Sequence, residues 1–134
     1  MLYIKKSTLP KCGLGLFSSA DIAKGEYIVE YKGDIYTWKK CIERAAEEDK
    51  AGYVFYVNRN YCIDAYDFPL ELARYANDAK GLRRKKDVTN NCEYLIKGKR
   101  VYIVAKKKLK AHTEILAPYG KDYWDEFEEC DDDN

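Results

Sequence analysis

The sequence predicts a mainly β protein built from small sheets. Short segments rich in β-branched and aromatic residues are separated by glycine-containing turns, and a single segment carries the apolar spacing of a helix. Strand-like and helix-like segments do not alternate, which argues against βαβ units and a parallel sheet. With 134 residues the chain has room for one core, so we expect a single domain over residues 1–134.

The element boundaries follow from the same patterns. Thr37 is a suitable N-cap, and apolar residues then recur at helical spacing until Gly52, which predicts a helix over residues 37–50. A short helical turn is expected after Pro69, carrying Leu70 and Leu72. The expected strands cover residues 2–5, 27–31, 53–57, 61–64, 92–96 and 101–104. The acidic tail over residues 125–134 is expected to fray.

Composition narrows the class of protein. Apolar residues make up 46% and charged residues 35%, which is typical of a folded, soluble chain, and the net charge of +1 gives the whole molecule no strong steering field. No signal peptide or membrane span is evident in the sequence. The five cysteines are scattered without a Cys-x-x-Cys pair, which argues against a structural zinc site and a disulfide framework, so a reducing compartment is expected.

The stretch over residues 113–124 carries the first functional signal. Pro118 ends or displaces a strand, and Gly120 permits a sharp turn, so the phenol of Tyr119 is expected at a strand end beside a cleft. Tyr123 and Trp124 are close enough in sequence to form its wall. An aromatic cap on a small core explains these residues as well.

A second signal is electrostatic. Residues 80–110 contain twelve basic and two acidic side chains. Such a run forms either a solvated face or a surface for nucleic acid or an acidic partner. Residues 79–89 within it are polar and are expected to form a surface loop.

Several motifs, taken in chain order, resemble the SET domain of protein-lysine methyltransferases. Residues 11–17 are similar to its opening Gly-x-Gly-x-Phe motif, and residues 22–33 to its I-x-x-G-E and E-Y-x-G motifs. Residues 74–78, Arg-Tyr-Ala-Asn-Asp, stand where the family has Arg-Phe-Ile-Asn-His, and Asn91-Cys92 resembles the P-N-C that follows. Residues 101–120 match the closing segment up to Tyr-Gly. The ending looks most like the minimal stand-alone SET proteins of viruses and bacteria, without a post-SET zinc segment.

The resemblance implies a fold and a chemistry. The implied fold consists of small curved sheets of the β-clip type with one or two short helices, and its C-terminal segment forms a pseudoknot. The implied activity is transfer of a methyl group from S-adenosylmethionine, which leaves as S-adenosylhomocysteine, to a lysine amine of a protein substrate. No metal ion is implied. The donor would bind on one face, and the lysine would enter a channel from the other.

The resemblance also assigns roles to individual residues. Tyr119 and Tyr53 match catalytic tyrosines, and the implied walls of the lysine channel are Tyr53, Ala117 and Tyr123. Because Ala117 is small where the family often has Phe or Tyr, we expect a product beyond monomethyl-lysine. The implied donor-binding residues are Cys12, Gly13, Leu14, Gly15, Arg74, Asn77, Asp78, Tyr119 and Trp124. The lone histidine, His112, is expected at the surface.

Two alternatives remain open at the level of sequence. Asp78 stands in place of the family's histidine, and a carboxylate is charged and can only accept hydrogen bonds at neutral pH. A SET-like interaction module without catalysis is therefore the first alternative. A small basic nucleic-acid-binding β protein is the second.

Partners and location are expectations of the same resemblance. The substrate would be a protein with an exposed lysine, such as a histone, a bacterial chromatin-like protein or a ribosomal protein. Weak nucleic-acid contact through residues 80–110 and a homodimer are both open, and no membrane partner is expected. The expected location is intracellular: the cytoplasm for a bacterial chain, and the host nucleus or chromatin for a viral chain or a secreted effector.

Overall fold

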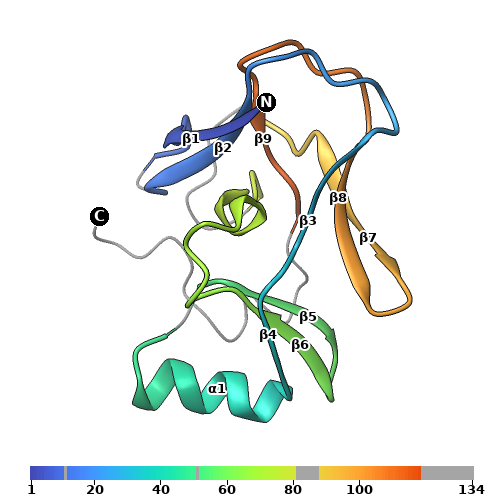
Figure 1. Ribbon diagram of the computed structural model, residues 1–134. Coiled ribbons are helices and arrows are strands. Elements are labelled where there is room, and N and C mark those ends of the chain that lie inside the picture. Colours follow the sequence, from blue (N-terminus) through green and yellow to red (C-terminus); the bar gives the residue numbers. More distant parts are fainter. Residues whose placement is uncertain (11, 51, 81–87, 119–134) are drawn as a thin grey trace.

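The computed structural model describes residues 1–10, 12–50, 52–80 and 88–118. The strands form three small sheets. Figure 1 shows them around a short central helical turn, drawn in yellow-green, which is the 3-10 helix η1 (Leu72–Tyr75). The elements in chain order are β1 (Leu2–Lys6), β2 (Leu14–Ser18), β3 (Tyr27–Glu30), β4 (Asp34–Tyr36), α1 (Trp38–Glu47), β5 (Val54–Asn58), β6 (Tyr61–Asp64), η1 (Leu72–Tyr75), β7 (Cys92–Lys97), β8 (Arg100–Ala105) and β9 (Glu114–Ile115). The prediction of a mainly β fold with small sheets is confirmed.

Each sheet has three antiparallel strands. The strand orders are β1-β2-β9, β3-β8-β7 and β4-β6-β5. The last strand, β9, thus returns to the sheet formed by the first two, and Leu16 pairs with Ile115 there. This return brings the C-terminal part of the described chain against its N-terminal part.

The core joins all three sheets. Leu16 of β2, Ile63 of β6, Ile103 of β8 and Ile115 of β9 are buried in one cluster. Burying side chains of this kind contributes about 1.5–3 kcal/mol each. A smaller cluster formed by Cys41, Val54 and Cys62 fixes α1 to the neighbouring sheet.

Helix α1 differs from the prediction in where it ends and in which residues it buries. Thr37 caps it as expected, since its side chain accepts from the N–H of Lys40. The helix ends at Glu47, and Ile42 on the expected apolar face is exposed. Arg44 is buried instead, because its guanidinium donates to Asp64 at 3.0 Å and to Asp67 at 3.1 Å.

The short elements were beyond the reach of sequence periodicity. Strands β4 and β9 are too short to show alternation, and β2 is buried on both faces apart from its first residue. The helical turn expected directly after Pro69 begins three residues after it, at Leu72, as η1. Leu70, which was expected within that turn, precedes η1 and is exposed. Within the described ranges, no helix is long and apolar enough to cross a membrane.

Candidate functional site

The segment 114–117 crosses between two parts of the chain that lie far from it in sequence. On one side the N–H of Ala117 donates to the carbonyl of Asn77 at 2.9 Å. On the other side the N–H of Asn91 donates to the carbonyl of Leu116 at 3.0 Å, and the Asn91 side chain accepts from the N–H of Leu116 at 2.9 Å. The crossing is therefore fixed by hydrogen bonds on both flanks.

This crossing is the contact that the expected pseudoknot requires. Asn77 and Asn91 belong to one stretch of chain, and residues 114–117 pass between its two ends. Residues 81–87 and 119–134, which would complete the threading, lie outside the described residues. Chain threading is rare in proteins, and no periodicity in the sequence indicates it.

The glycine-containing loop before β2 is held against this crossing. The side-chain amide of Asn77 donates to the carbonyl of Leu14 at 3.1 Å, and the N–H of Ser7 donates to the carbonyl of Gly13 at 2.7 Å. Gly13 has φ +67, a conformation that glycine adopts without strain. The side chain of Leu14 is 48% exposed, so the loop is accessible while its backbone is fixed.

Glu114 is the buried residue that connects these parts. One carboxylate oxygen accepts from the N–H and the hydroxyl of Thr8. The other accepts from the hydroxyl of Ser7 at 2.8 Å and from the side-chain amide of Asn77 at 3.2 Å. A Cβ on Gly15 would collide with this second oxygen, so a larger residue there would displace the carboxylate from its hydrogen bonds. The carboxylate thus joins β9 to the residues that follow β1 and to Asn77, and it lies against Gly15 of β2.

Arg74 and Tyr53 form a separate group. The guanidinium of Arg74 lies 4.0 Å from the ring centre of Tyr53, and it donates to the carbonyls of Ala65 and Tyr66 at 2.9 and 2.7 Å. Within the described residues, its Nε is buried without an acceptor. Arg74 therefore braces the ring of Tyr53 rather than the loop around Leu14.

Asp78 is bonded within its own loop. Its carboxylate accepts from the N–H of Lys80 at 2.8 Å and from the side-chain amide of Asn90 at 3.0 Å. Asn90 in turn accepts from the N–H of Ala79 at 2.8 Å. Asp78 and Asn90 are both buried, so this reciprocal pair closes the loop between them.

Some of the remaining predicted site residues lie within the described residues and others do not. Ala117 is fully buried in the main core. Cys12 is disulfide-bonded, which the sequence analysis did not anticipate, whereas Cys41, Cys62 and Cys92 are free among the described residues. His112 is at the surface as expected, hydrogen-bonded to the hydroxyl of Tyr3. The predicted site residues Tyr119, Tyr123 and Trp124 lie outside the described residues, so their roles stay predictions.

The sequence reasoning missed Glu114 and Asn90. Glu114 lies in the closing motif that carries the family resemblance, and its acidic side chain directly before the apolar run 115–117 was a usable signal of a buried, bonded carboxylate. Asn90 had no such signal, since its partner is twelve residues away in sequence. Among the described residues, no group of three or more His, Cys, Asp and Glu side chains is arranged to hold a metal ion.

Comparison with known proteins places this geometry in a family. The SET domain profile matches residues 13–120. The chain is 32% identical over 126 residues to the N-lysine methyltransferase KMT5A-A of Xenopus laevis, covering 87% of this chain and 36% of that protein. It is 32% identical over 128 residues to the histone-lysine N-methyltransferase EZH2 of Chaetomium thermophilum, covering 88% of this chain and 8% of that one. The chain thus spans about a third or less of the length of these relatives.

Solved structures agree with the sequence relatives. A structure of ctPRC2 in an autoinhibited conformation bound to S-adenosylmethionine superposes with a TM-score of 0.71 at 29% identity, covering 89% of this chain and 15% of that chain. An active polycomb repressive complex 2 in the stimulated state gives a TM-score of 0.72 at 28% identity, covering 90% of this chain and 15% of that chain. The crossing, the fixed loop before β2 and these matches lead to one conclusion: the chain belongs to the SET-domain family.

Proposed function

We propose that this chain is a protein-lysine N-methyltransferase that uses S-adenosylmethionine. The crossing at residues 114–117 is the observation that carries the proposal. It brings the accessible loop at Leu14, the side chain of Asn77 and the segment leading to Tyr119 to one place. The relatives named above are lysine methyltransferases, which supports the same reaction class.

The loop before β2 has the properties that a donor site needs. Its backbone is fixed by Asn77 and Ser7, and its outer side is accessible. Gly15 packs directly against the carboxylate of Glu114, which fixes the start of β2 beside the crossing. The carboxylate of Asp78 accepts hydrogen bonds from Lys80 and Asn90. Its negative charge is therefore balanced by these donors and not by the loop before β2.

The chemistry required of the protein is mostly positioning. When bound, S-adenosylmethionine supplies a methyl group on a positively charged sulfur. The lysine amine must be neutral to accept it, although free lysine has a pKa near about 10.4. An apolar channel beside a positive charge disfavours the ammonium, so the proton can leave to solvent without a strong base. Tyr53, braced by Arg74, and Tyr119 are proposed to align the amine.

The number of methyl groups transferred is part of the proposal. Ala117 presents a small side chain two residues before Tyr119, and a small residue leaves room for an amine that already carries a methyl group. We therefore propose products beyond monomethyl-lysine. Mass spectrometry after exhaustive reaction tests this, and a product that stops at the first methyl group would contradict it.

The central experiment combines donor binding with methyl transfer. Calorimetric titration with S-adenosylmethionine should give binding, and a peptide array of lysine-rich sequences, including histone tails, should reveal methylated substrates. Tyr119→Phe should lose most of the transfer, whereas Tyr27→Phe, the same change at an exposed tyrosine of β3, should retain it. A folded protein that does not bind the donor would refute the proposal. Donor binding without transfer to any substrate would favour the interaction-module alternative.

A further inference from the structure

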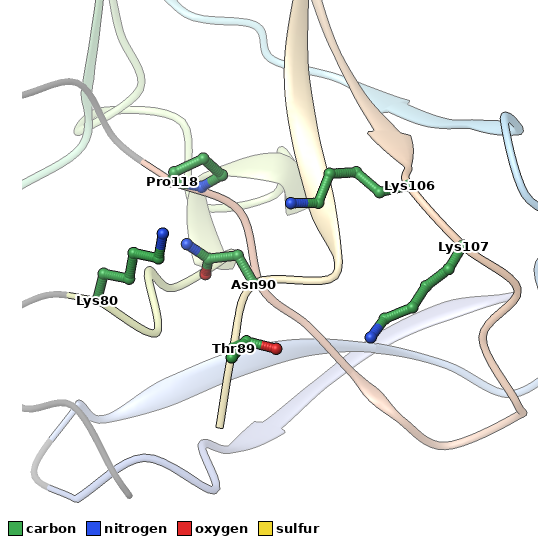
Figure 2. Close-up of a pocket in the computed structure, with 6 residues that line it drawn as sticks. All are labelled: Lys80, Thr89, Asn90, Lys106, Lys107 and Pro118. Atoms are coloured by element: carbon green, nitrogen blue, oxygen red, sulfur yellow. The ribbon is translucent and has the colours of Figure 1, made fainter. Parts of the chain in front are cut away.

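A lysine-lined pocket lies beside the crossing. It has a volume of about 440 Å³ and is lined by Lys80, Thr89, Asn90, Lys106, Lys107 and Pro118. Figure 2 shows the ammonium ends of all three lysines turned toward the space between Thr89, Asn90 and Pro118. Pro118 immediately precedes Tyr119, so the pocket borders the proposed active site.

The three ammonium groups have no matching anion in the described part of the chain. None of the ion pairs found there includes Lys80, Lys106 or Lys107. The carboxylate of Asp78, a hydrogen-bond partner of the lining residue Asn90, is buried and also accepts from the backbone N–H of Lys80. Three like charges directed into one space repel each other, and an anion there would relieve that repulsion.

Basic and acidic side chains are unevenly distributed along the sequence. Residues 80–110 hold twelve basic and two acidic side chains, whereas the chain as a whole holds 24 and 23, so the remainder carries 12 basic and 21 acidic side chains. The near-zero net charge therefore conceals a strongly basic segment of the sequence, which supplies all three lysines of the pocket. Such asymmetry favours a polyanionic partner.

The chemistry of the lining indicates which polyanion. Lysine ammonium groups are point charges suited to phosphate oxygens, and the described lining contains no arginine fork for bidentate carboxylate binding. It also contains no aromatic ring on which unpaired bases could stack. These features fit the backbone of a duplex, bound without regard to base sequence.

We propose that this lysine pocket binds phosphate groups of double-stranded DNA next to the active site. The inference rests on the proposed function for its purpose, because DNA held here would bring the chain beside basic proteins that are themselves bound to DNA. The binding itself does not depend on catalysis.

The test is the salt dependence of duplex binding by the 134-residue chain. Fluorescence anisotropy with a labelled 20-base-pair duplex would be measured between 50 and 200 mM KCl for the wild type and for Lys80→Gln/Lys106→Gln/Lys107→Gln. The matched control is Lys97→Gln/Lys99→Gln/Arg100→Gln, which removes equal charge at the tip of the β7–β8 hairpin, about 17 Å away along β8. Circular dichroism and thermal unfolding confirm that both variants fold.

The expected result is a smaller salt slope in the pocket variant alone. Each lost phosphate contact lowers the slope of log K against log salt by about 0.9, so three contacts lower it by about 2.7. Over this fourfold salt range the wild type should lose about 40-fold more affinity than the pocket variant. Lys107→Gln alone should lower the slope by about 0.9, and duplexes of different sequence should bind equally.

Several results would overturn the inference. These are a wild type that does not bind the duplex, a pocket variant with an unchanged slope, and a hairpin variant with the same loss as the pocket variant. Binding of a polyglutamate peptide that depends on the pocket, without duplex binding, would assign the pocket to an acidic protein instead. Donor titration in parallel keeps the two proposals separate: failure to bind S-adenosylmethionine refutes the methyltransferase proposal and leaves the duplex result standing.

Discussion

The substitution Glu114→Gln tests the crossing most directly. It preserves the size of the side chain but replaces one acceptor oxygen by an NH₂ group. The hydroxyls of Ser7 and Thr8 can rotate to accept from this group. The N–H of Thr8 and the side-chain amide of Asn77 are donors, and each faces one of the two carboxylate oxygens. Either orientation of glutamine therefore brings an NH₂ group against a donor.

The two orientations have unequal consequences. The backbone N–H of Thr8 cannot turn away, but the side chain of Asn77 can flip and present its oxygen to the new NH₂ group. A flipped Asn77 then directs its oxygen at the carbonyl oxygen of Leu14, and the hydrogen bond that fixes the loop is lost. Water can replace that bond because Leu14 is exposed, but the buried side chain at position 114 also loses its charge, and hydrogen bonds to a charged group contribute about 1.5–3 kcal/mol. We expect the free energy of unfolding to fall by this amount.

Urea unfolding measures the effect. With a denaturant slope of about 2 kcal/mol/M, a loss of 2 kcal/mol moves the midpoint by about 1 M. Affinity for S-adenosylmethionine should also fall by about 5–10-fold, because one hydrogen bond to the donor loop is lost. Glu93→Gln makes the same chemical change at an exposed position of β7 and should stay within about 0.5 kcal/mol of the wild type. A midpoint for Glu114→Gln equal to that of Glu93→Gln would refute the reasoning.

Three further predictions concern charge and burial. Arg44→Met should destabilise the chain by about 3–5 kcal/mol, because Asp64 would stay buried without its partner, whereas Lys40→Met on the exposed face of α1 should change little; equal losses in urea unfolding would contradict this. Hydrogen bonds from Arg44 and the neighbouring lysine hold the pKa of Asp67 below its usual range, so its ionised form stabilises the folded chain above about pH 4 and this contribution is lost as pH falls through the folded pKa. Asp67→Asn should therefore reduce the loss of stability on acidification, as measured by thermal unfolding between pH 6 and pH 2. Burial raises the pKa of Cys92 to about 12, so alkylation at pH 8 followed by mass spectrometry should find this thiol unmodified in the native chain and modified in urea.

Sequence reasoning predicted the longer elements because their patterns are local. Thr37 caps α1 through a hydrogen bond to an N–H three residues ahead, and the β7–β8 hairpin joins neighbours in the chain. Periodicity and capping signals report on such short-range relations. The order and spacing of the motifs also indicated the SET family, although each motif alone was weak.

The burial of Arg44 shows why the rest could not be predicted. On the helix it occupies an ordinary charged position. The residues that make its burial favourable, Asp64 and Asp67, come 20 and 23 residues later in the sequence. Glu114 is the same case on a larger scale, since its donors Ser7 and Thr8 are more than a hundred residues away. Burial of a charge depends on partners that only the folded chain assembles.

Asp78, which stands where the SET family has histidine, is hydrogen-bonded to Asn90. When the sequence alone is compared with the family motif, a carboxylate in place of histidine suggests weaker binding of the methyl donor. In the structure the carboxylate is satisfied by Asn90 and by the N–H of Lys80, and Asn90 also holds the N–H of Ala79. The aspartate therefore closes its loop at the point where that loop flanks the crossing. Because the crossing holds Asn77 and, through it, the loop at Leu14, this rearrangement of bonding is compatible with the geometry on which donor binding depends.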